Sequence, residues 1–248
     1  LRNVSMALIY RLSLSIPFSK VRGTKSSITN EIRFSCDLTS TDLNQPLQIN
    51  LPKMFGRFEM GSSNYSPPNW HSNLKTGQEI STPNDNWWQI SDFMSGAGDI
   101  KNVWEKSRFN WAICLAEPIS AGRQQHIDIL NHWINDWVDK NPPYKGANWK
   151  CGQETSLRLI NLALASSFLK IPSDSEKGIS QWVMSHLLRI QVTAGYALSQ
   201  QNNHGISEAA GLYIGGLWLS KISYKHASYA KKCIDIGRQR LEQLSQSL

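Results

Sequence analysis

The sequence lacks several features that would assign it directly to a class of protein. No apolar run approaches the roughly 20 residues that a membrane-spanning helix needs. The apolar stretch over residues 6–18 is interrupted by Arg11, which makes it a poor core for a signal peptide. No repeat indicates a solenoid of the tetratricopeptide or ankyrin kind. We therefore expect a globular chain without a membrane span.

Cysteine is scarce and scattered. The four cysteines, Cys36, Cys114, Cys151 and Cys233, show no CxxC spacing, and this argues against a zinc site. Cys114 and Cys233 fall within apolar helical patterns, which favour buried free thiols. The sequence indicates no metal ligands and no cofactor.

Acidic residues are outnumbered by basic ones. The chain has 26 Lys and Arg against 19 Asp and Glu, a formal net charge of +7. This balance suits a polyanionic partner, either nucleic acid or an acidic polysaccharide. The basic residues are dispersed, with no dense run beyond Lys231-Lys232 and no nucleic-acid motif, so solvated lysines explain the excess equally well. We expect an acidic polysaccharide rather than nucleic acid.

Tryptophan, in contrast, is abundant, with ten in the chain. An indole ring fills a helical core and also stacks against a sugar ring. For most of these residues a place in the core is the favoured interpretation. Four that fall in predicted loops suit either role equally: Trp70, Trp87, Trp88 and Trp149.

The chain divides near residue 98. Residues 1–98 are rich in Ser, Asn, Pro and Gly, which predicts an irregular N-terminal extension packed on the rest of the chain. Beyond it, apolar residues recur at helical spacing. The predicted helices span about residues 99–116, 123–139, 152–169, 175–198, 206–220 and 226–244. Short polar turns join them, so we expect a mainly α fold of antiparallel pairs packed side by side.

A polar cluster precedes the fifth predicted helix. Residues Gln201-Asn202-Asn203-His204-Gly205 come directly before a helical run that contains Glu208. We expect Gly205 to be the N-cap, with Glu208 three residues later, where the helix dipole favours an acid. Glu208 is thereby assigned to the helix start rather than to catalysis. Polar side chains and free N–H groups at a helix N-terminus suit an anion such as a carboxylate or sulfate.

Three segments, taken in order, resemble the heparinase II/III and alginate lyase group of polysaccharide lyases. They are residues 98–109, then Asn141-Pro142-Pro143 with Gly146-Ala147-Asn148-Trp149-Lys150, Glu154 and Arg158, and finally Asn202-Asn203-His204 with Glu208-Ala209-Ala210-Gly211-Leu212. The resemblance covers about residues 85–248. It implies an incomplete (α/α) toroid of antiparallel helical hairpins over residues 99–248.

In that family the toroid is followed by a β-sandwich, and a catalytic tyrosine lies downstream of the Asn-Asn-His segment. By the resemblance, the rest of the toroid, the sandwich and this tyrosine are expected beyond Leu248. Members of the family are mostly exported, which favours a periplasmic or secreted location.

The resemblance implies that Asn203 and His204 are catalytic residues of a β-elimination. A lyase of this kind removes the C5 proton of a uronate, so donors have to neutralise the neighbouring carboxylate. Asn203 is expected to be such a donor, because an amide takes up no proton at neutral pH. His204, with an ordinary pKa of about 6.5, is expected to assist it or to act as the base. The alternatives are a helix-capping amide and a structural histidine.

The resemblance also implies five substrate-binding residues, Asn148, Trp149, Glu154, Arg158 and Asn202. Asn148 and Trp149 are expected to line the cleft as a polar contact and a sugar platform, and the alternative is a packed turn. Arg158 suits a role in holding a uronate, whereas its spacing from Glu154, four residues earlier, favours the alternative of a structural ion pair.

Two other functions stay open at this point. A toroidal glycoside hydrolase needs two carboxylates that flank one cleft, for which Asp136, Asp139 and Glu154 are candidates. A non-catalytic glycan-binding or scaffold domain needs only the tryptophans and the positive charge.

Overall fold

The computed structural model describes residues 2–15, 27–28, 31–36, 49–60, 65–80, 83–94 and 96–246, and these residues form a mainly α-helical structure. The α-helices are α1 (Arg2–Ser15), α2 (Lys101–Trp104), α3 (Asn110–Ser120), α4 (His126–Lys140), α5 (Gly152–Ser166), α6 (Glu176–Ser199), α7 (Asn203–Ile222) and α8 (Ala227–Ser245). The 3-10 helices are η1 (Glu105–Arg108), η2 (Ala147–Trp149) and η3 (Tyr224–His226). Strands β1 (Phe93–Met94) and β2 (Gly98–Asp99) pair in antiparallel fashion.

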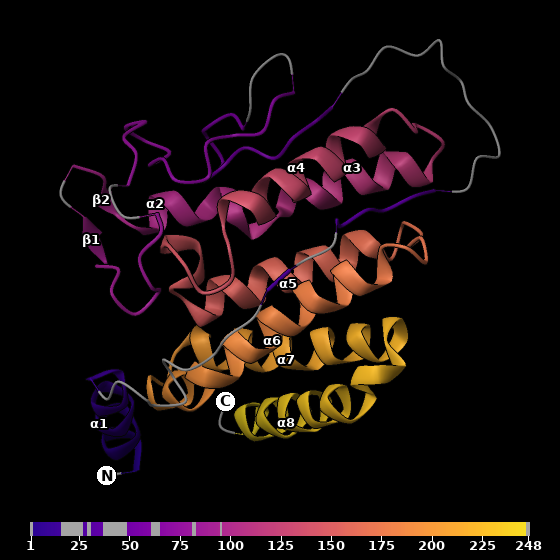
Figure 1. The fold of residues 1–248 in the computed structure, drawn as a ribbon. Helices are drawn as coiled ribbons and strands as arrows, with labels where there is room; N and C mark the ends of the chain where they lie inside the picture. The colour runs from indigo at the N-terminus through magenta and orange to yellow at the C-terminus, as the bar shows by residue number, and fades with distance from the viewer. Residues whose placement is uncertain are drawn as a thin grey trace.

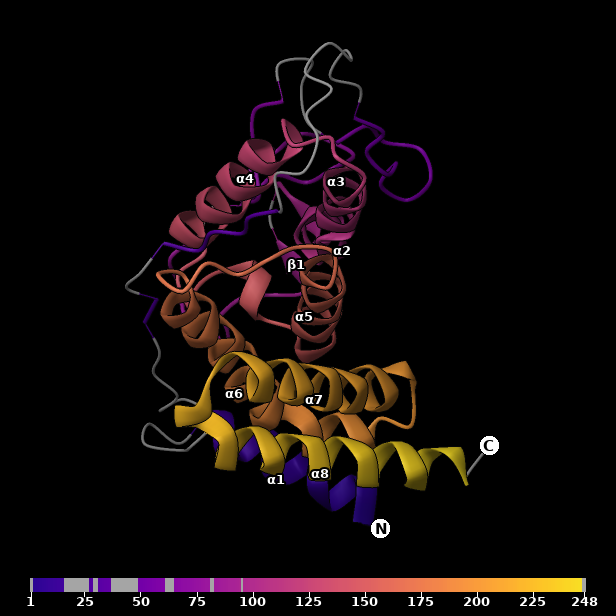
Figure 2. The same cartoon turned by 90° about the vertical axis from the view of Figure 1, so that its right-hand side faces the viewer.

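The long helices are stacked in pairs, as Figure 1 and Figure 2 show. Helix α3 packs against α4 and α5, α5 packs against α6 and α7, and α7 packs against α8. Helix α1 packs against α6, at the same end of the stack as α8. The predicted mainly α class is confirmed. None of the described helices has the length and apolar character to cross a membrane.

Helices α4 to α8 lie within three residues of their predicted ends. The prediction of one continuous helix over residues 99–116 is wrong, because the segment breaks at Phe109. Phe109 has a left-handed φ of 65°, which costs an L-residue about 1–2 kcal/mol. Its buried ring packs 4.9 Å from Trp111 and 5.2 Å from Trp137, centroid to centroid, and this packing offsets the backbone strain.

The described part of the N-terminal 98 residues combines one helix with irregular segments. The irregular extension predicted for this region differs from the structure at residues 2–15, which form the 14-residue helix α1. The short segment of residues 31–36 is held on α4, where the side-chain amides of Asn131 and Asn135 accept from the backbone N–H groups of Phe34 and Ile32 at 2.8 and 3.0 Å. Because Ile32 and Phe34 are buried, this segment contributes to the same core as the helices.

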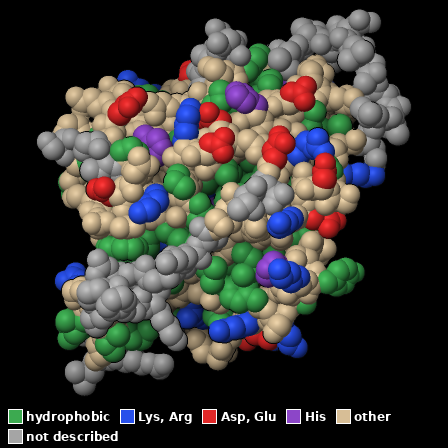
Figure 3. Space-filling view, viewed as in Figure 1, with side chains coloured by type: hydrophobic (Ala, Val, Ile, Leu, Met, Phe, Trp, Pro, Cys, Tyr) green, Lys and Arg blue, Asp and Glu red, His purple; other side chains and the backbone are tan. Residues whose placement is uncertain are grey.

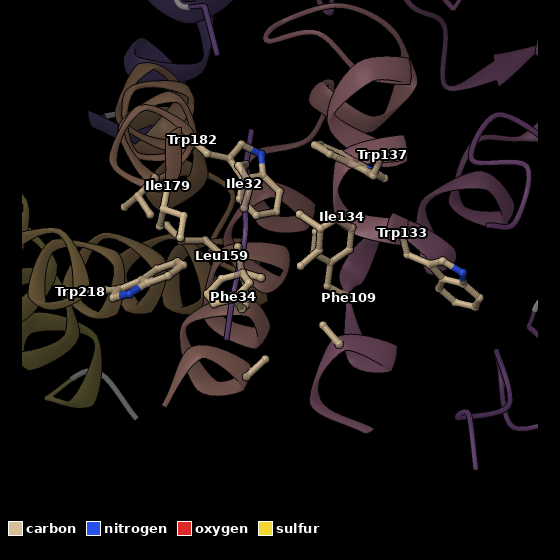
Figure 4. Close-up of a cluster of buried hydrophobic side chains, with 14 of the residues drawn as sticks. Ile32, Phe34, Phe109, Trp133, Ile134, Trp137, Leu159, Ile179, Trp182 and Trp218 are labelled. Atoms are coloured by element: carbon tan, nitrogen blue, oxygen red, sulfur yellow. The ribbon is translucent and has the colours of Figure 1, made fainter. Parts of the chain in front are cut away.

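The core combines aliphatic side chains with many aromatic ones (Figure 4). Six indoles are fully buried: Trp70, Trp111, Trp133, Trp137, Trp149 and Trp182. Most of their N–H groups have partners, so burial of this polar atom is compensated. Trp137, for example, donates to Ser107 Oγ at 3.0 Å, and Trp149 donates to the carbonyl of Asn141 at 2.9 Å.

Helix α7 approaches α5 and α8 closely through glycines. A Cβ atom at Gly215 would lie 2.4 Å from Leu159 Cδ2 on α5. A Cβ atom at Gly237 of α8 would lie 2.6 Å from the backbone nitrogen of Tyr213 on α7. Since both distances are shorter than real Cβ contacts, these glycines set how closely the helices pack. The position of α7 matters because its N-terminus carries the Asn202-Asn203-His204 segment.

None of the four cysteines is in a disulfide bond. Cys233 is buried, as predicted, whereas Cys114 is only partly buried. On the face shown in Figure 3, acidic and basic side chains are interspersed over α3 and α4 rather than separated by sign.

Candidate functional site

A cavity of about 480 Å³ opens beside the N-terminus of α7. Five parts of the chain line it: α1, residues 87–104 with the ribbon and α2, the start of α5, the end of α6 and the start of α7. Its wall includes Tyr10 from α1, Tyr196 from α6, and His204 and Glu208 from α7. The rings of Tyr10 and Tyr196 are stacked, with centroids 4.3 Å apart and planes inclined by 16°. The cavity therefore joins an aromatic wall to titratable side chains.

Helix α7 begins three residues earlier than predicted, and its N-cap is Asn202 rather than Gly205. Asn202 Oδ1 accepts from the backbone N–H of His204 at 3.0 Å, a standard capping bond. Asn202 and Asn203 are exposed. His204 lines the cavity, whereas neither asparagine is part of its wall. The structure thus gives Asn202 a capping role, and Asn203 is exposed to solvent outside the cavity wall.

His204 is suited to accept a proton at neutral pH. Burial lowers its pKa, the nearby carboxylate of Glu154 opposes this effect, and the ammonium group of Lys101 adds to it. The imidazole is therefore mainly neutral at pH 7. Its Nδ1 atom lies 3.9 Å from Glu208 Oε1, one helical turn away, which is too long for a hydrogen bond.

Glu208 is a site residue that the sequence assignment to the helix start missed. It is 2% exposed, and burial raises its pKa to about 7 against the opposing effects of Arg189, a hydrogen bond from Thr193, and Arg240. The Thr193 hydroxyl lies 3.2 Å from Glu208 Oε2. The signal in the sequence is the spacing: Glu208 comes four residues after His204, which places both side chains on one face of a helix.

Space for the Glu208 carboxyl group depends on Gly152, the first residue of α5. A Cβ atom there would lie 2.5 Å from both Glu208 Oε1 and Thr193 Oγ1. We expect Gly152→Ala to lower the free energy of unfolding in urea by about 1–3 kcal/mol, because the buried side chains of Glu208 and Thr193 have to move. The matched control is Gly205→Ala, where the nearest atoms would lie 3.6 Å away. Equal stability of the Gly152 variant and wild type would contradict this role.

The raised pKa of Glu208 has a measurable effect on stability. Its folded-state pKa of about 7 exceeds the ordinary 4.5, so the folded protein binds more protons than the unfolded chain between these pH values. Stability is then lost as the pH rises through this window. We expect Glu208→Gln to be more stable than wild type by about 1–3 kcal/mol at about pH 8. The difference should vanish below pH 4.5, as urea unfolding at both pH values would show. A pH-independent difference would contradict this.

Glu154 has a different partner from the one considered in the sequence. Its carboxylate forms a two-point ion pair with Arg108, whose Nε and Nη2 atoms lie 2.6 and 2.8 Å from Oε2 and Oε1. Arg108 also contacts Glu105 at 2.5 Å. The alternative ion pair of Glu154 with Arg158 is therefore not formed. Glu154 acts on the site through its charge, which raises the pKa of His204.

Arg158 is 1% exposed, so in this structure it cannot reach a uronate. Its guanidinium donates to His186 Nε2 at 2.9 Å, to the carbonyl of Ser107 at 3.1 Å and to that of Asn148 at 2.9 Å. It also lies over the Trp137 ring, 4.4 Å from the centroid. The substrate-binding prediction for Arg158 is corrected accordingly, because its donors are already used inside the protein.

Asn148 and Trp149 also lie inside the protein, with exposed fractions of 1% and 0%. Asn148 Nδ2 donates to Asn141 Oδ1 at 2.8 Å and to the carbonyl of Trp70 at 3.1 Å. The Trp149 ring packs 4.8 Å from that of His186. A ring without exposed surface offers no platform to a sugar, so the alternative of a packed turn describes this pair.

Protein-family models, curated proteins and solved structures were compared with the chain, and none matches it.

Proposed function

We propose that this chain carries part of the active cleft of a polysaccharide lyase that cleaves a uronate-containing glycan by β-elimination. The observation that supports it most is the cavity wall at the start of α7, where His204 lies 3.9 Å from Glu208. Both residues belong to the third segment that resembles the lyases, Asn202-Asn203-His204 with Glu208-Ala209-Ala210-Gly211-Leu212. The stacked helical pairs fit the first part of an incomplete (α/α) toroid, which we include in the proposal.

The chemistry assigns a separate task to each group. His204 takes the C5 proton, the C5 electron pair forms the C4–C5 double bond, and the bond from C4 to the glycosidic oxygen breaks. The lowered pKa of His204 keeps the imidazole neutral and able to accept that proton. The exposed amide of Asn203 donates to the uronate carboxylate as charge develops on it. A further acid protonates the leaving oxygen, and the family resemblance assigns this step to a tyrosine downstream.

The first test is the ultraviolet absorbance of an unsaturated uronide during incubation of uronate polymers with the full-length protein, which includes the downstream tyrosine that the proposal requires. Alginate, hyaluronan, heparan sulfate and an acidic bacterial exopolysaccharide form a suitable panel. A rising absorbance with one polymer supports elimination and identifies the substrate. New reducing ends without this absorbance contradict elimination and indicate hydrolysis, and polymer binding without either product indicates a binding domain.

One observation favours a glycoside hydrolase as the second candidate. Glu208, with a pKa of about 7, has the property of a general acid, and Asp92 and Asp99 line the same cavity as possible second carboxylates. The candidates named from the sequence lie elsewhere: Asp136 accepts from the Trp70 indole and pairs with Lys140. The reducing-end measurement above separates this candidate from the lyase.

A further inference from the structure

Phe93 is an exposed aromatic residue at the wall of the cavity. It is 76% exposed, although most aromatic residues of the described chain are at least partly buried. The residue belongs to β1, directly opposite Asp99 of β2. Because Phe93 is both exposed and part of the cavity wall, its ring is accessible to a ligand in the cavity.

The backbone around Phe93 is anchored to the helical body. The carbonyl of Asp92 accepts from the N–H of Ile100 at 3.1 Å, and the carbonyl of Ile90 accepts from Lys150 Nζ at 2.5 Å. Lys150 also pairs with the Asp92 carboxylate at 3.2 Å. These bonds hold the chain just before the ring, so Phe93 is presented from a fixed support.

Two exposed cations, Lys101 and Arg11, line the same cavity. Within the described residues neither forms an ion pair. The Lys101 charge lowers the pKa of His204, which places its ammonium group within electrostatic reach of the imidazole. Of the two nearby aspartates, Asp92 pairs with Lys150, and Asp99 accepts from the backbone N–H of Lys101 at 2.9 Å. The cavity therefore keeps positive charge available for an anion.

We propose that Phe93 and Lys101 form a sugar-binding subsite of this cavity for an acidic glycan. The Phe93 ring stacks on the apolar face of a pyranose, and the Lys101 ammonium pairs with a carboxylate or sulfate on the chain. A stacking ring and an available cation in the wall of one cavity fit this ligand, because each sugar offers a flat apolar face and an anionic group. The subsite rests on the proposed function for its place beside His204, whereas its binding role does not require elimination.

The test is affinity electrophoresis in gels that contain alginate, hyaluronan or uncharged dextran. We expect Phe93→Ala to weaken the retardation in the uronate gels about three- to tenfold, and Phe93→Trp to retain it. Phe55→Ala is the matched control, because Phe55 is 45% exposed and lies outside the cavity wall. Lys101→Gln should weaken retardation in the uronate gels and reduce its dependence on salt. Far-ultraviolet circular dichroism checks that each variant is folded.

The outcomes separate the subsite from the lyase activity. Loss of retardation in Phe93→Ala without any elimination by wild type supports the subsite and counts against the lyase. Elimination by wild type with unchanged KM and retardation in Phe93→Ala overturns the subsite and leaves the lyase. Stronger retardation in dextran than in alginate overturns the role of Lys101, and an absence of retardation in every gel overturns the subsite.

Discussion

Replacement of His204 with alanine is expected to lower the rate of elimination by about 10²- to 10⁴-fold, the usual contribution of a general base. The His204 side chain is 29% exposed and is not a core residue, so the variant should keep its fold. The measurement is the initial rate of unsaturated-uronide formation on the polymer that wild type cleaves. Circular dichroism and the urea midpoint of the variant are recorded alongside.

Two companion variants sharpen this experiment. His132→Ala removes an exposed histidine of α4 outside the cavity wall and should leave the rate unchanged. Asn203→Ala removes the proposed carboxylate donor, and loss of one such donor lowers the rate by about 10²- to 10³-fold. Wild-type rates in both the His204 and the Asn203 variants would refute the proposed catalytic pair.

Replacement of Arg158 with methionine is expected to cost on the order of 3–5 kcal/mol of stability, since several buried acceptors lose their donor together. These are His186 Nε2 and the carbonyls of Ser107 and Asn148. Burial lowers the pKa of Arg158 to about 9, so the guanidinium is still charged at pH 7. Burial and the charge of Arg158 hold the pKa of His186 well below its ordinary value, which keeps this imidazole an acceptor.

Urea unfolding at pH 7, followed by tryptophan fluorescence, measures the loss of stability in Arg158→Met. Arg238→Met on α8 is the control, because the side chain is 61% exposed and pairs only with the neighbouring Asp235 among the described residues. Its effect should stay within about 0.5 kcal/mol. Arg158→Lys keeps the positive charge but lacks the planar guanidinium with its several donors, so its loss of stability should lie between those of the two methionine variants. A loss below about 1 kcal/mol in Arg158→Met would show that solvent or neighbouring groups replace the lost donors.

The helices could be predicted because their signals are local. Apolar spacing and the turns at Asn141-Pro142-Pro143 and around Pro172 placed α4, α5 and α6 with small errors. The break at Phe109 was not visible, since its left-handed backbone depends on packing against Trp137, which is 28 positions away in the sequence. Long-range packing overrode a favourable local helical pattern.

The candidate site could be predicted only in part for the same reason. The Asn-Asn-His segment pointed to the start of α7, and His204 lines a cavity there. The ion pair of Arg108 with Glu154 joins residues 46 positions apart, so spacing along one helix suggested the wrong partner. The burial of Trp149 and Arg158 depends on side chains from α4 and α6, which sequence patterns do not bring together.

The contacts among the buried indoles make the core a single optical unit. Trp111 and Trp133 lie 5.2 Å apart, Trp137 and Trp149 lie 5.9 Å apart, and the Phe109 ring lies between Trp111 and Trp137. At these separations, electronic excitation passes readily from one indole to the next. We therefore expect the emission and the near-ultraviolet dichroism of these buried indoles to be collective rather than assignable to single tryptophans. A spectral change on unfolding or ligand binding reports the loosening of the whole aromatic array rather than the environment of one ring.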